Sequence, residues 1–143
     1  MLHSPELLFV YGTLQSTFAN RWARLLRRHA TLLGTAETKG RLYRMRGYPA
    51  LRISGSGAVY GQLWQLRDLA VLRELDNYEG RNYQRLRVDV QLKSSIRPAF
   101  AYAWRRPLPE WRRIQDGIFS RSKPNFDYHV NEPSSGCVED SGA

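Results

Sequence analysis

The sequence has 143 residues, with 22 lysines and arginines against 13 acidic residues, which gives a formal net charge of +9. This length favours one domain with its own hydrophobic core. No apolar run approaches the ~20 residues of a membrane-spanning helix, and the first residues lack a signal-peptide pattern. We therefore expect a cytoplasmic protein without a membrane segment. A single cysteine, Cys137, excludes a disulfide framework and a cysteine-based zinc site.

The positive charge is confined to the first 130 residues. Residues 131–143 hold three acidic residues and no basic one, so residues 1–130 carry a net charge of +12. We expect a single domain over residues 1–130 and a disordered acidic tail over residues 131–143. Arginine supplies 19 of the 22 positive charges, and such a composition raises the question of an anionic partner.

In chain order, the first predicted elements are strands separated by one helix. Leu7–Tyr11 is an unbroken apolar run, which is typical of a strand buried on both faces. Apolar residues then recur at helical spacing over residues 18–29, with arginines opposite, and this indicates a short amphipathic helix. Short strands are predicted at Thr31–Ala36 and Arg41–Arg46.

The middle of the chain has the clearest patterns. Ala58–Leu66 is rich in aromatic and branched residues, and Tyr83–Lys93 alternates apolar with polar residues, so both predict strands. Asp68–Tyr78 predicts a helix capped by its first residue and stopped by Gly80. Ala99–Trp104 places alanines on one face, which suits a closed or strongly curved sheet around a cavity. The layout predicts an α+β fold with a barrel-like sheet.

Two common kinds of site are not supported. The histidines His3, His29 and His129 lie far apart without metal-ligand spacing, so we expect no metal site. The glycines at 55, 57 and 61 fall short of a dinucleotide fingerprint, because a strand follows them where that motif requires a helix. A glycine-rich hairpin is the favoured interpretation of this run.

Glu79 is the strongest candidate for chemistry. It falls near the centre of the apolar arc of its helix, one turn beyond Leu75, where a leucine is expected. Burial and the helix dipole would both raise the pKa of Glu79 toward the range of a general acid/base. Alternatively, the helix ends at Tyr78 and Glu79 turns outward to pair with Arg81 or Arg85. The helical pattern alone does not separate these alternatives.

Two other features are weaker candidates. Asp76 lies at the edge of the same arc and could be a second carboxylate, although an ordinary surface role is favoured. The segment Tyr11–Leu14 ends a buried strand in Gly12 and Thr13, so its backbone N–H groups could hold an anion. Many strand ends share this pattern, so it predicts little by itself.

The Tyr11–Leu14 segment and the helix end that carries Glu79 resemble, together with other segments, the γ-glutamylcyclotransferase-like family. This family includes AIG2-like proteins and γ-glutamylamine cyclotransferase. The segments follow the family's order: LFVYGTL at 8–14, YPAL at 48–51, VYGQL at 59–63, LDNYEG at 75–80, AY at 101–102 and IQDGIF at 114–119. In the last of these, Phe119 stands where the family usually has tryptophan.

The resemblance implies a small mixed β-barrel with flanking helices and a central cavity. It also implies cofactor-independent cleavage of γ-glutamyl amides to 5-oxoproline and a free amine or amino acid. In that case Glu79 is the general acid/base, and the γ-glutamyl group is held by the backbone of the loop Tyr11, Gly12, Thr13 and Leu14. Tyr83 and Tyr102 are candidates for the wall of the substrate site, although packing is the favoured role of each.

A non-catalytic binding module on the same barrel is the alternative function. Arginine and aromatic residues interleave at Tyr43–Tyr48 and at Trp111–Arg113, a pattern that can bind RNA or another polyanion. A solvated arginine-rich surface also explains both runs, and it is the favoured interpretation. The sequence specifies neither the leaving amine nor the oligomeric state.

Overall fold

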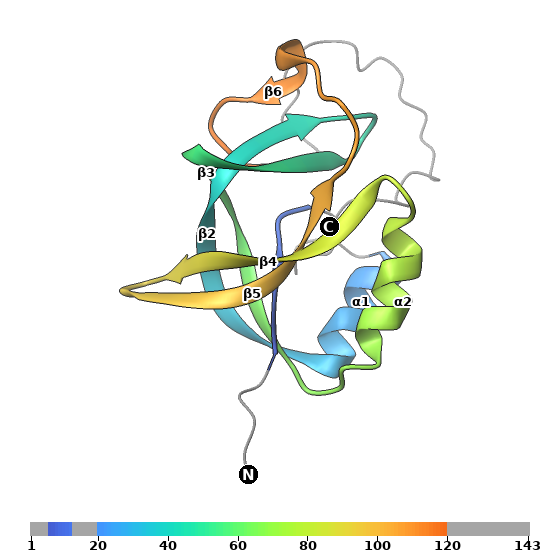
Figure 1. Cartoon of the computed structure of the whole chain (residues 1–143). Helices are drawn as coiled ribbons and strands as arrows, with labels where there is room; N and C mark the ends of the chain where they lie inside the picture. Colours follow the sequence, from blue (N-terminus) through green and yellow to red (C-terminus); the bar gives the residue numbers. More distant parts are fainter. Residues whose placement is uncertain (1–5, 13–19, 120–143) are drawn as a thin grey trace.

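The computed structural model describes residues 6–12 and 20–119. The predictions made for Thr13, Leu14, Cys137 and residues 131–143 lie outside this part of the chain. Its elements, in order, are β1 (Leu7–Val10), α1 (Arg21–His29), β2 (Ala30–Arg44), β3 (Pro49–Leu66), α2 (Val71–Glu79), β4 (Tyr83–Leu92), β5 (Ser95–Trp104), the 3₁₀ turn η1 (Glu110–Arg112) and β6 (Arg113–Ile114) (Figure 1).

The sheet closes on itself. Strand β3 pairs with β1, β1 with β5, β5 with β4, β4 with β2, and β2 again with β3, while β6 is added beside β2. The β1–β5 pairing is parallel, and the other described pairings are antiparallel. The predicted α+β class with a closed, mixed sheet is thus confirmed as a ring of strands.

Strands β2 and β3 are longer than predicted. The predicted strands Thr31–Ala36 and Arg41–Arg46 are parts of one strand, which pairs with β3 from Ala30 opposite Leu66 to Arg44 opposite Pro49 and ends before Met45 and Arg46. Tertiary pairing overrides the local sequence here, since each strand supplies the ladder partners of the other.

The glycine run is not the hairpin turn that the sequence suggested. Residues 54–57 bulge out of β3, because Ile53 lies opposite Gly40 and Ala58 lies opposite the adjacent Lys39. The turn of the hairpin is at Met45–Tyr48, where the Met45 N–H donates to the Tyr48 carbonyl over 2.8 Å.

Helix α2 begins later than predicted. Asp68 caps the turn before the helix, with its Oδ1 atom accepting from the Ala70 N–H at 3.0 Å, and the helix itself starts at Val71. It continues through Glu79 and stops because Gly80 adopts φ 80°, a left-handed conformation that favours glycine. The prediction of a stop at Gly80 is therefore confirmed.

The two helices lie side by side against one side of the ring (Figure 1). Asn20 caps α1 by accepting from the Ala23 N–H at 2.8 Å. The helices meet where Trp22 stacks on Tyr78, with ring centroids 5.0 Å apart. Neither helix is long and apolar enough to cross a membrane within the described residues.

Candidate active site

Glu79 is the last residue of α2, and its side chain points into the protein. The residue is only 2% exposed to solvent, like the apolar members of the same helix face. The sequence left open whether Glu79 faces the protein interior or turns outward to pair with an arginine. In the structure it faces the interior. Arg85, one of the suggested outward partners, forms its ion pair with Asp76 instead.

Three buried tyrosines interact electrostatically with Glu79, and all three were sequence candidates. Burial is the main cause that raises the pKa of Tyr11, Tyr83 and Tyr102 above its ordinary value. The negative charge of Glu79 raises each of these pKa values further, so its carboxylate lies within electrostatic reach of all three hydroxyls. Residues from α2, from the end of β1 and from β4 and β5 thus interact electrostatically with one another.

Each of these tyrosines donates its proton to a fixed acceptor. The Tyr11 hydroxyl donates to the Tyr102 carbonyl, and the Tyr83 hydroxyl donates to the Pro49 carbonyl over 2.5 Å. The Tyr102 hydroxyl donates to Oδ1 of Asp76 over 2.7 Å. Phenols are neutral near pH 7 and these protons are already donated, so what Tyr83 and Tyr102 offer to a ligand is an oxygen lone pair. The oxygen of Tyr11 already interacts with the backbone of Leu51, which lowers the pKa of Tyr11 against the effect of burial.

Asp76 has a role that the sequence did not predict. Its Oδ1 atom accepts from the Tyr102 hydroxyl and also lies 3.2 Å from Nε of Arg85. The carboxylate therefore connects α2 to both β4 and β5, beside Glu79, which follows three residues later on the same helix. That helical spacing was visible in the sequence, but nothing local identified the partners on the hairpin.

The strand that leads into the predicted loop is held by a close backbone approach. A Cβ atom on Gly61 would lie 2.2 Å from the Val10 carbonyl oxygen and 3.0 Å from Cα of Tyr11. Only glycine lets β3 pass this close to the end of β1. Tyr11 and Gly12 are buried there, while Thr13 and Leu14 lie outside the described residues. Substrate binding by this loop stays a prediction.

The described residues hold no cluster of histidine, cysteine or carboxylate side chains that could bind a metal ion. A groove of about 450 Å³ lies between β2, β3 and the β4–β5 hairpin, with Thr38, Ile53 and Arg87 among its lining residues. Glu79 does not line it, so this groove is separate from the tyrosine-lined site.

Comparison with known proteins places the chain in a family. A family model described as gamma-glutamyl cyclotransferase, AIG2-like, matches residues 8–121. The structure is similar to that of an AIG2-like protein from Mus musculus, with a TM-score of 0.70 and 27% identity over 85% of this chain and 92% of that one. The search of curated proteins found no match.

Two further solved structures show the extent of the similarity. YkqA from Bacillus subtilis matches with a TM-score of 0.67 and 26% identity over 81% of this chain, which spans 40% of the YkqA chain. A structure described as gamma-glutamyl cyclotransferase, at 18% identity and a TM-score of 0.55, shares the fold over 71% of this chain and 68% of that one. The family match covers most of the chain, and the protein belongs to the AIG2-like gamma-glutamyl cyclotransferase family.

Proposed function

We propose that this protein is a γ-glutamyl cyclotransferase that releases 5-oxoproline and a free amine or amino acid from a γ-glutamyl amide. The observation that carries the proposal is the burial of Glu79 at the end of α2, where its charge raises the pKa of the hydroxyls of Tyr11, Tyr83 and Tyr102. A carboxyl group withdrawn from water favours its protonated form more than an exposed one does, which suits it to accept and return a proton. Membership of the family supports the same chemistry.

The substrate supplies its own nucleophile. The α-amino nitrogen of the γ-glutamyl group attacks its γ-carbonyl carbon, and the new C–N bond closes a five-membered ring. Glu79 takes the proton that the nitrogen loses. The bond from the same carbon to the leaving nitrogen then breaks, and Glu79 returns the proton to the departing amine. The reaction is intramolecular, so most of the gain comes from holding the folded conformer of the substrate, and no cofactor is required.

The tyrosines would support this proton transfer without competing in it. Their hydroxyl protons are already donated to Pro49, Asp76 and a backbone carbonyl, so the oxygens of Tyr83 and Tyr102 can accept a hydrogen bond from the substrate amino group. Backbone N–H groups of the Tyr11–Leu14 loop would hold the α-carboxylate or the oxyanion of the tetrahedral intermediate.

The test is a screen of γ-glutamyl amines and γ-glutamyl amino acids for release of 5-oxoproline. On any substrate that the protein accepts, Glu79→Gln should lower the rate by about 100- to 10,000-fold, the usual contribution of a general acid/base. Glu74→Gln is the matched control, because Glu74 is on the exposed face of the same helix and should retain full activity. Full activity of Glu79→Gln, or no release from any compound, would overturn the proposal.

A further inference from the structure

One end of the sheet collects arginines from distant parts of the sequence. Strand β6 pairs with β2, which sets Arg113 opposite Tyr43. Just before it, Nη1 of Arg112 donates to the Arg44 carbonyl over 2.9 Å. The two arginine-aromatic runs of the sequence are therefore neighbours at the end formed by the β2–β3 hairpin, η1 and β6 (Figure 1). We call this the arginine-rich end; it contains Arg41, Arg46, Arg52, Arg112 and Arg113.

The positive charges at this end are poorly balanced. Arg41 and Arg52 lie directly opposite each other in the β2–β3 ladder, an arrangement that is unfavourable for like charges. Both arginines donate hydrogen bonds to neutral oxygens: Arg41 to Oγ of Ser56 over 3.3 Å, and Arg52 to the carbonyls of Trp104 and Arg106. An unneutralised pair of this kind favours an external anion.

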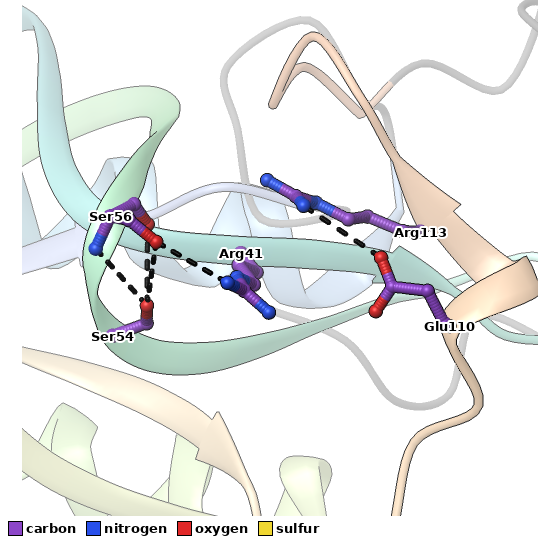
Figure 2. Close-up of polar contacts among 5 residues, drawn as sticks. All are labelled: Arg41, Ser54, Ser56, Glu110 and Arg113. Atoms are coloured by element: carbon purple, nitrogen blue, oxygen red, sulfur yellow. Dashed lines mark hydrogen bonds and ion pairs between the residues drawn. The ribbon is translucent and has the colours of Figure 1, made fainter.

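The acidic partner at this end is weakly placed. Nη1 of Arg113 lies 3.7 Å from the Glu110 carboxylate, whose side chain is 65% exposed, and such surface pairs contribute little. Figure 2 shows this pair beside Arg41, which reaches toward the bulge that carries Ser54 and Ser56. Glu110 thus pairs weakly with one of these five arginines.

Aromatic side chains lie among these arginines. Trp111 is 67% exposed, and the guanidinium carbon of Arg112 lies 4.6 Å from the centre of its ring. Burial raises the pKa of the half-buried Tyr48, while the positive charges of Arg46 and Arg112 lower it, so both arginines lie near its hydroxyl. A large exposed aromatic ring flanked by cations matches the chemistry of a base next to its phosphates.

We propose that the arginine-rich end binds single-stranded nucleic acid. Trp111 stacks on an unpaired base, and the surrounding arginines contact the phosphates on either side. An unpaired strand fits better than a duplex because the bases of a duplex are already stacked on one another and cannot reach an indole. This inference is independent of the cyclotransferase activity and uses none of the residues assigned to that reaction.

The test measures binding of a fluorescently labelled oligouridylate of about 12 nucleotides by polarisation, at several salt concentrations. If four arginines each contact a phosphate, the affinity should fall about 50-fold between about 50 and 200 mM salt. Trp111→Ala should weaken binding by about fivefold or more, and Trp111→Phe should restore most of it, since any aromatic ring can stack. Arg46→Gln should also weaken binding and reduce the salt dependence.

Arg73→Gln is the matched control, because it removes the same charge from the exposed face of α2 and should leave binding unchanged. Near-ultraviolet circular dichroism of each variant verifies that the fold is intact. The proposal is overturned if the protein does not bind at low salt, or if Arg73→Gln weakens binding as much as Arg46→Gln. It is also overturned if an abasic strand, heparin or phosphatidylserine vesicles bind as well as the oligonucleotide and Trp111→Ala has no effect.

Discussion

The tyrosines around Glu79 predict a steep loss of stability in alkaline solution. In the folded protein, burial raises the pKa of Tyr11, Tyr83 and Tyr102 above the ordinary value of 10.0, so these hydroxyls retain their protons. The unfolded chain releases them at about pH 10. Because the folded-state pKa is the higher one, the stabilisation is fully present below about pH 10 and is lost as the pH rises further.

The size of the effect follows from the number of buried hydroxyls. Once the unfolded chain is deprotonated, each such group lowers the free energy of unfolding by about 1.4 kcal/mol per pH unit. The three groups together should therefore remove about 4 kcal/mol between about pH 9 and 11. This is a large part of the ~5–15 kcal/mol that stabilises a typical domain.

Urea denaturation followed by tryptophan fluorescence across this pH range measures the loss. Tyr83→Phe should reduce the pH-dependent loss by about one third, because phenylalanine has no proton to release. Tyr60→Phe is the matched control, since Tyr60 is 42% exposed, and it should keep the full pH dependence. If the free energy of unfolding at about pH 11 stays within ~1 kcal/mol of its value at pH 9, the reasoning is refuted.

Two further predictions concern the contacts that position the site. In a double-mutant cycle, Asp76→Asn and Tyr102→Phe should show a coupling of about 1 kcal/mol in the free energy of unfolding, because they share a charge-assisted hydrogen bond; strictly additive effects would contradict that contact. Gly61→Ala should destabilise the protein by about 2 kcal/mol or more, since its Cβ would meet the Val10 carbonyl at 2.2 Å. Gly55→Ala, where nothing lies within 4 Å, should be nearly neutral, and thermal denaturation of both variants distinguishes them.

Sequence patterns predicted which faces of the helices and strands are buried better than they predicted which elements lie next to one another. The unbroken apolar run of β1 and the carboxylate on the apolar arc of α2 follow from periodicity, and the structure has both buried. The alanine face of β5 predicted a closed or strongly curved sheet, but not which strands close it, because β2 pairs with β4 and β1 with β5 across large separations in the chain. For the same reason, neither the Asp76–Arg85 ion pair nor the opposition of Arg41 and Arg52 could be predicted.

The distribution of charge bears directly on the proposed role of Glu79. A neighbouring guanidinium would favour the ionised carboxylate and lower its pKa, which is the wrong direction for a group that must hold and return a proton near neutral pH. Because the protein carries a net charge of +9, the placement of its arginines relative to Glu79 matters for this role. Arg85, on the strand that follows α2, directs its charge to Asp76. The negative charge of Glu79 raises the pKa of Tyr83, while the positive charges of Arg46 and Arg112 lower the pKa of Tyr48. The ion pair with Asp76 thus directs the charge of Arg85 to a carboxylate other than Glu79.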